Sequence, residues 1–152
     1  MPHSKKMSKG TALITGGAVR LGKVFSETLA DAGYKLAIHY NTSSEQAAIT
    51  AEEIKKKGVD VQTFQFDFSQ KNDVSILIKN VREQFPDLNV LINSASAYDQ
   101  ANMMETSELI LERQFKINFL TPYLLTQAFV QQCKSGDVIN IIDNKIAFNQ
   151  YQ

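Results

Sequence analysis

The chain has 152 residues, a length that suits one domain with a buried core. Its 16 Lys and Arg residues balance 16 Asp and Glu residues, so the net charge favours neither nucleic acid nor an anionic membrane as a partner. The sequence contains no run of about 18 apolar residues, the length needed to span a bilayer. The basic residues 1–9 are not followed by the apolar stretch of a secretory signal. Because Cys133 is the single cysteine, no internal disulfide can form. We expect a flexible tail at 1–9 and a cytoplasmic protein.

A glycine-rich segment follows the first predicted strand. Apolar residues 12–14 lead into the sequence Thr-Gly-Gly-Ala-Val-Arg-Leu-Gly at positions 15–22. Behind it, apolar or small residues recur at helical spacing, at Leu21, Val24, Phe25, Thr28, Leu29 and Ala32. Glycines allow a tight turn and a close backbone approach to a pyrophosphate, and the unpaired N–H groups of a helix N-terminus attract anions. The segment therefore predicts a dinucleotide site, with an ordinary strand-to-helix loop as the alternative.

Strands and helices alternate along the rest of the chain. We expect strands at 35–40, 61–66, 90–92 and 138–142, and helices at 42–57, 70–85 and 107–132. Thr42 and Glu45 form a capping box for the helix that ends at Gly58. Gly33 can stop the helix before it, and Pro86 closes the helix at 70–85. The alternation predicts an α/β fold, a doubly wound parallel sheet of about five strands in one domain over residues 10–152.

Ligands of such sheets bind beyond the carboxyl ends of the strands. The residues that stand at these ends are Gly16, Asn41, Asp67, Asn93 and Asp143. Their shared place in the pattern predicts that they surround one ligand site.

The end of the second strand indicates which dinucleotide is bound. NAD-specific folds carry an acidic residue about 20 positions after the glycine turn, for the ribose 2′-hydroxyl. Here the strand ends in Tyr40-Asn41-Thr42-Ser43, without a carboxylate. Small polar groups together with Arg20 suit a 2′-phosphate, which favours NADPH over NADH. Arg20 could instead be a surface arginine, and Asp67 could either receive the adenine amino group or cap a helix.

Taken together, these residues resemble the short-chain dehydrogenase/reductase family, and more closely its pteridine reductase-like branch. The family's turn is usually Thr-Gly-x-x-x-Gly-x-Gly, and Arg20 replaces the middle glycine here, as in that branch. Residues 39–43 are similar to the branch's segment beside the NADPH phosphate, with Thr42 where an arginine is often found. Residues 93–96, Asn-Ser-Ala-Ser, are similar to the family's Asn-Asn-Ala-Ser element.

The resemblance implies a Rossmann-type fold, a small-molecule substrate, no metal, and a role for each matching residue. The cofactor would be held by Gly16, Arg20, Leu21, Gly22, Tyr40, Asn41, Thr42, Ser43, Asp67, Asn93, Ala95 and Ser96. Tyr98 matches the position that stacks on a pterin ring, although it could also be a loop tyrosine that half-covers the core. Asn118 matches the asparagine that holds a proton-relay water, and Asp143 takes the place of the catalytic serine. Asp143 could also simply start a turn.

One motif of the family is missing from the sequence. The family's catalytic Tyr-x-x-x-Lys follows the position of Asp143 by about a dozen residues, whereas the sequence stops nine residues after it. Tyr151 lies eight residues after Asp143 and has no lysine four positions later. We expect the N-terminal portion of an NADPH-dependent reductase of carbonyl or pterin-like C=N substrates, inactive as it stands and self-associating through the exposed strand at 138–142. The alternatives are a non-catalytic nucleotide-binding or oligomerising module and a non-functional remnant.

Overall fold

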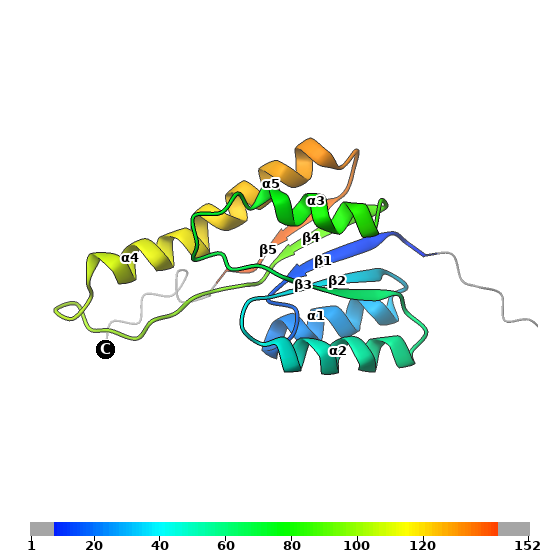
Figure 1. The fold of residues 1–152 in the computed structure, drawn as a ribbon, viewed down its shortest axis with the longest axis horizontal. Coiled ribbons are helices and arrows are strands. Elements are labelled where there is room, and N and C mark those ends of the chain that lie inside the picture. Colours follow the sequence, from blue (N-terminus) through cyan, green and yellow to red (C-terminus); the bar gives the residue numbers. More distant parts are fainter. Residues whose placement is uncertain (1–7, 143–152) are drawn as a thin grey trace, which may run out of the picture.

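The structure is a computed structural model that describes residues 8–142, so Asp143 and Tyr151 lie outside the described residues. The elements along the chain are β1 (Thr11–Thr15), α1 (Arg20–Asp31), β2 (Lys35–Tyr40), α2 (Ser44–Lys56), β3 (Val61–Gln65), α3 (Ser75–Gln84), β4 (Leu88–Asn93), α4 (Glu108–Phe115), a π-helical segment η1 (Lys116–Leu120), α5 (Thr121–Gln132) and β5 (Asp137–Asn140). Figure 1 shows them as layers around one sheet.

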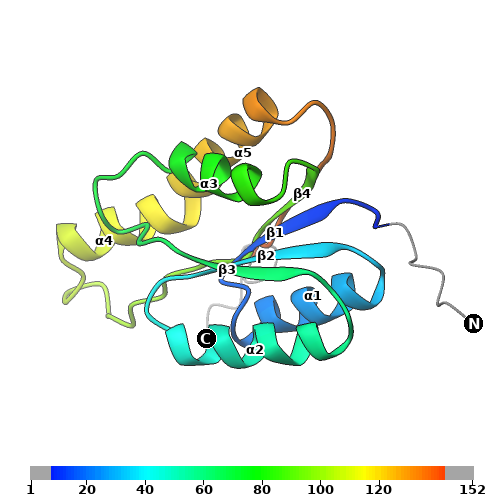
Figure 2. The same ribbon diagram turned by 45° about the vertical axis from the view of Figure 1, so that its right-hand side comes forward.

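The strands form a parallel sheet in the order β3-β2-β1-β4-β5. Helices α1 and α2 cover one face, and α3 and α5 cover the other (Figures 1 and 2). The predicted doubly wound α/β fold is therefore confirmed. Because β2 lies on one side of β1 and β4 lies on the other, the strand order reverses at β1, and the crevice between the ends of β1 and β4 is the place where such sheets bind ligands.

The core explains why the central strand β1 shows no alternation of buried and exposed residues. Neighbouring residues of a strand point to opposite faces, so Leu13 packs with α3 and α5 while Ile14 packs with α1 and α2. All five residues of β1 are buried. A central strand buried on both faces has no solvent side, and this removes the alternation of polar and apolar residues.

The start of α2 differs from the prediction. The helix begins at Ser44, its N-cap is Ser43, and no side chain caps it. The N–H of Ser44 bonds the carbonyl of Thr42 instead. The predicted capping box of Thr42 and Glu45 is therefore wrong, because a short turn at the end of β2 moves the helix start by one residue.

The start of α3 also differs, since the helix begins at Ser75 and not at Gln70. The carboxylate of Asp67 accepts the N–H of Ser69, and that of Asp73 accepts the N–H of Ser75. These side chains compete with the helix for backbone donors and hold the intervening segment in turns. Strand boundaries shift less: β3 ends before Phe66, β4 runs from Leu88 to Asn93, and β5 covers Asp137–Asn140.

The long helix predicted at 107–132 is continuous but contains the π-helical segment η1. The Ser107 hydroxyl caps its start by accepting the N–H of Ile110. Where η1 meets α5, the N–H of Thr121 bonds the carbonyl of Lys116, five residues back. Pro122 follows directly and has no N–H for the carbonyl four residues before it. The proline therefore gives a physical reason for the wider turn at this place.

Candidate functional site

The glycine turn between β1 and α1 depends on two of its glycines. Gly16 has φ +65°, in the left-handed region that glycine adopts without strain. A Cβ on Gly22 would lie 2.1 Å from the carbonyl oxygen of Gly16, so only glycine lets the helix start this close to the turn. A Cβ on Gly16 would lie 3.1 Å from the Cα of Ala95, which places the turn against the segment that follows β4.

Arg20 occupies a strained backbone position in this turn. Its φ is +50°, and no other non-glycine residue among residues 8–142 has a positive φ. A left-handed conformation costs a residue with a Cβ roughly 1–2 kcal/mol. The side chain is exposed, so no packing compensates for this cost. Strain of this kind is typical of functional sites.

The N-terminus of α1 is open to an anion. Its N-cap, Val19, is extended and makes no side-chain cap, and the first turn holds no acidic residue. The backbone N–H groups of a first helical turn have no partner inside the helix. The exposed Leu21 and the buried Gly22 lie in this turn. The turn therefore fits a phosphate group, which would accept hydrogen bonds from the N–H groups.

His39, at the end of β2, holds the turn in place. Its Nδ1 accepts the N–H of Gly16 at 3.1 Å, its Nε2 lies 2.8 Å from the carbonyl of Phe66, and its own carbonyl accepts the N–H of Gly17 at 3.1 Å. A carbonyl only accepts, so Nε2 carries the proton and the ring is neutral. Burial lowers the pKa of His39 to about 4.

Sequence reasoning gave His39 no supporting role of its own. The signal was a histidine inside an apolar strand, which must find partners for both ring nitrogens when it is buried.

The segment after β2 lies beside the end of β3. Tyr40 and Ser43 are half-buried, while Asn41 and Thr42 are exposed. The Asn41 side chain donates to the Asp67 carboxylate at 3.3 Å, which joins the two strand ends. Asn41, predicted to lie beside the 2′-phosphate, and Asp67, predicted to contact adenine, are therefore neighbours.

Asp67 caps the turn that follows β3. One carboxylate oxygen accepts the hydroxyl of Ser69 at 2.7 Å and its N–H at 2.8 Å. These bonds, that of the hydroxyl first, hold the pKa of Asp67 below its usual value. The cap belongs to a turn and not to a helix, and contact with adenine stays a prediction.

The end of β4 is joined to both neighbouring strands. Asn93 is buried, and its Nδ2 donates to Oδ1 of Asn140 on β5 at 2.8 Å. The hydroxyl of Thr15, at the end of β1, accepts the N–H groups of Ser94 and Ala95 at 3.0 Å each. Asn93 therefore links the ends of β4 and β5, and Asn140 is a partner that sequence reasoning missed.

The segment after β4 is fastened to the long helix. The side chain of Asn118 accepts the N–H of Ala97 and donates to its carbonyl, both at 2.8 Å. Each group of the amide keeps one further hydrogen-bonding position, so a water could still bind there. Arg113 on α4 pairs with Asp99. Residues on both sides of Tyr98 are thus held.

Tyr98 itself points into solvent, with 75% of its surface exposed. It does not half-cover the core, so that alternative is wrong. Ser96 is exposed as well. Asp143, the other predicted catalytic residue, lies outside the described residues.

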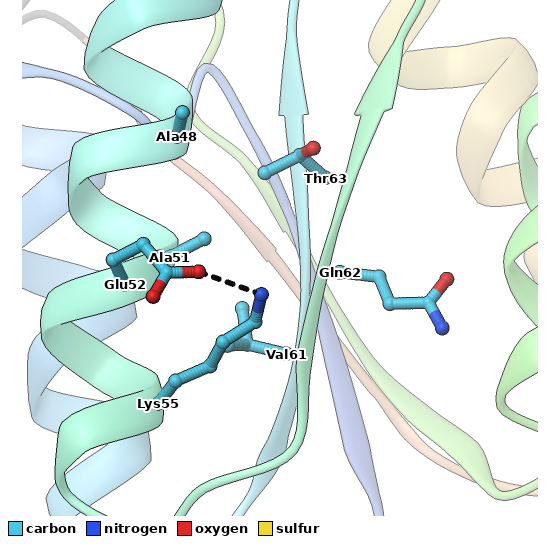
Figure 3. A pocket seen from close by; sticks show the side chains of 7 residues that line it. All are labelled: Ala48, Ala51, Glu52, Lys55, Val61, Gln62 and Thr63. Carbon is cyan, nitrogen blue, oxygen red and sulfur yellow. Dashed lines mark hydrogen bonds and ion pairs between the residues drawn. The ribbon is translucent and has the colours of Figure 1, made fainter.

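A groove of about 340 Å³ lies elsewhere, between α2 and β3. Figure 3 shows its lining, in which Lys55 bonds Glu52 beside Val61, and Thr63 lies further along β3. None of the predicted site residues lines this groove. Within residues 8–142, no cluster of His, Cys, Asp and Glu could hold a metal, and no helix is long and apolar enough to cross a membrane.

Known proteins share both this sequence pattern and this fold. The chain is 34% identical over 145 residues to the 3-oxoacyl-[acyl-carrier-protein] reductase FabG of Staphylococcus aureus, covering 90% of this chain and 56% of that protein. The crystal structure of FolM alternative dihydrofolate reductase 1 from Brucella canis, complexed with NADP, is 29% identical with a TM-score of 0.84, covering 91% of this chain and 57% of that one. A mutant short-chain dehydrogenase/reductase of Serratia marcescens, 19% identical with a TM-score of 0.89, shares the fold and covers 95% of this chain and 59% of that one.

The chain therefore spans a little more than half the length of these relatives. Residues 10–147 match the short chain dehydrogenase family over most of the sequence. The chain belongs to the short-chain dehydrogenase/reductase family.

Proposed function

We propose that the chain is the cofactor-binding part of an NADPH-dependent reductase that delivers hydride to a carbonyl or to a pterin-like C=N bond. The observation that carries this proposal is Arg20, a strained and exposed arginine in the glycine turn. A protein that only needed the turn would keep glycine there. The guanidinium is suited to a phosphate because it offers several N–H donors in a planar fork. The NADP in the FolM structure supports this assignment.

Different predicted site residues are assigned to different parts of the cofactor. Gly16, Leu21 and Gly22 would receive the pyrophosphate, and Arg20, Thr42 and Ser43 the 2′-phosphate. Tyr40, Asn41 and Asp67 would line the adenosine end, and Asn93, Ala95 and Ser96 the nicotinamide end. When bound, the nicotinamide supplies the hydride. The chain contributes binding, orientation and exclusion of water at the crevice between β1 and β4.

The substrate side rests on the segment after β4. Tyr98 presents its ring to solvent next to Ala97, which Asn118 holds. A flat heteroaromatic ring such as a pterin would stack on this tyrosine. Asn118 and Asp143 would then hold a water for proton transfer. A simple carbonyl substrate has no flat ring that could stack on Tyr98.

Calorimetry tests the cofactor assignment. We expect the chain to bind NADPH at least ten times more tightly than NADH, since a charge-assisted contact of about 1.5–3 kcal/mol is at stake. Arg20→Ala should lower the affinity for NADPH alone. Lys79→Ala, at an exposed position on α3, is the control and should change neither affinity. Equal affinities of the unsubstituted chain for NADH and NADPH would contradict the assignment.

A second candidate function is a non-catalytic module that associates through its sheet edge. Strand β5 is an edge strand among the described residues, and Ile139 is 47% exposed on it. An apolar edge strand is a template for pairing with another chain. Light scattering should then find oligomers that Ile139→Lys disperses, whereas Thr63→Lys on the opposite edge strand β3 does not. A clean monomer at high concentration would remove this candidate.

A further inference from the structure

Lys116 makes contacts that the proposed site does not yet explain. It is the first residue of η1, and its Nζ donates to two backbone carbonyls, those of Ser69 and Gln70, the first at 3.1 Å. Both carbonyls belong to the loop between β3 and α3. No carboxylate pairs with Lys116 in the part of the chain that the structure describes. Its charge therefore serves to hold this loop.

The loop in question follows directly from the adenosine end of the site. Asp67 starts it, holds the N–H and the hydroxyl of Ser69, and accepts the side chain of Asn41. The loop thus has two anchors, one at Asp67 and one at the carbonyls that Lys116 holds. Without the second anchor, residues 69–70 would keep only the bonds to Asp67 and their local turn contacts.

The same π-helical segment also holds the other loop of the site. Asn118 lies two residues after Lys116 and bonds both backbone groups of Ala97. Residues two apart in a helix point to roughly opposite sides, so one segment can reach two loops. The segment after β4 and the loop after β3 are therefore fastened to a single rigid element.

We propose that Lys116 is a positioning residue that fixes the loop after β3 relative to the substrate segment, so that the adenosine half of NADPH meets a preformed site. This inference rests on the proposed function, because the loop's ligand is the cofactor. Lys116 touches neither cofactor nor substrate in this role. Because Lys116 holds the loop before the cofactor binds, it reduces the entropy cost of ordering the loop on binding.

The first test measures the loop without any ligand. Hydrogen–deuterium exchange should show faster exchange for amides 68–72 in Lys116→Met, by about 5- to 30-fold for a loss of 1–2 kcal/mol. Amides 94–99 should be unchanged, and Lys116→Arg should restore most of the protection. Lys79→Met is the matched control. Unchanged exchange at 68–72, or a uniform rise over the whole sheet, would overturn the proposal.

The second test uses adenosine 2′,5′-bisphosphate, which carries the adenosine half of NADPH without the nicotinamide. In calorimetry, Lys116→Met should weaken this probe and NADPH by the same factor, about 5- to 30-fold. Full affinity for the bisphosphate in Lys116→Met would overturn the proposal. If the unsubstituted chain binds neither probe, the proposed function fails, and the exchange experiment still decides the role of Lys116 in the loop.

Discussion

The two halves of the crevice are built differently. The region proposed to hold most of the cofactor, residues 8–67, is called the cofactor region here. It surrounds the glycine turn with strands whose central residues are buried, and its shape is set by the backbone at Gly16 and Gly22 and by the ring of His39. The region proposed to meet the nicotinamide and the substrate, residues 94–142, is called the substrate region here; it contains α4, which buries no residue, and β5, which is largely exposed. Here the loop is held by single side chains such as Arg113 and Asn118.

This difference indicates which part of the site has its shape before any ligand binds. In the cofactor region the backbone itself fits a phosphate, so the shape is lost only if the fold changes. In the substrate region exposed apolar side chains, among them Phe115, Phe119 and Tyr123, leave a surface of the kind that usually meets another surface. We expect cofactor binding to be a property of these 152 residues and catalysis not to be.

Turnover is the largest expected effect. A carbonyl that accepts hydride needs a proton, and general acid catalysis contributes about 10²- to 10⁴-fold in rate. The 152 residues include no Tyr-x-x-x-Lys after Asp143. Mixed with NADPH and quinonoid dihydropterin or a panel of carbonyl compounds, the chain should cause no loss of NADPH absorbance. Robust oxidation that Tyr151→Phe abolishes would show that Tyr151 supplies the proton.

A change at Gly22 should damage the cofactor region most. In Gly22→Ala the new Cβ would meet the Gly16 carbonyl at 2.1 Å, a contact with backbone that cannot rotate away. We expect a loss of about 3 kcal/mol in the free energy of unfolding, at the upper end for overpacking, together with loss of NADPH binding. Gly58→Ala is the control, because its φ is +78° but nothing lies within 4 Å of the new Cβ. Urea unfolding that ranks the two variants equally would contradict this reading of the turn.

The stability of the cofactor region should depend on pH through His39. Its pKa is about 4 in the folded chain and 6.5 as the ordinary value. Above pH 6.5 the ring is neutral in both states and has no effect. As the pH falls from 6.5 to 4, only the unfolded chain takes up the proton, so the free energy of unfolding decreases by up to about 3 kcal/mol and then levels off.

His39→Gln should flatten this slope, because glutamine does not titrate, and its amide can still accept from Gly16 and donate to Phe66. His3→Gln removes the other histidine and should leave the slope unchanged. Urea midpoints measured between pH 7 and pH 4 make the comparison. A slope that persists in His39→Gln would assign it to other groups.

Relief of strain at Arg20 is the smallest effect. Arg20→Gly removes a left-handed residue with a Cβ and should raise the free energy of unfolding by about 1 kcal/mol, while Arg20→Ala keeps the strain and should not. Both variants should lose the preference for NADPH. The same stability in the two variants would mean that φ at this position carries no cost.

The sequence determined the alternation of strands and helices, the parallel sheet and the glycine turn. These follow from apolar periodicity and from glycine, which act over a few neighbouring residues. Helix starts were less predictable, because the carboxylates of Asp67 and Asp73 take backbone donors that a helix would otherwise use. The cofactor and catalytic roles of the site residues stay predictions.

Only the tertiary structure decided which distant groups meet. The link from His39 to Gly16, the pair of Asn93 and Asn140, and the bonds from Lys116 to the loop after β3 join residues on different elements. Their partners are largely backbone groups, which every residue carries, so no sequence pattern marks them. The local sequence determines each element, whereas the packing of strands side by side determines which backbone group each polar side chain reaches.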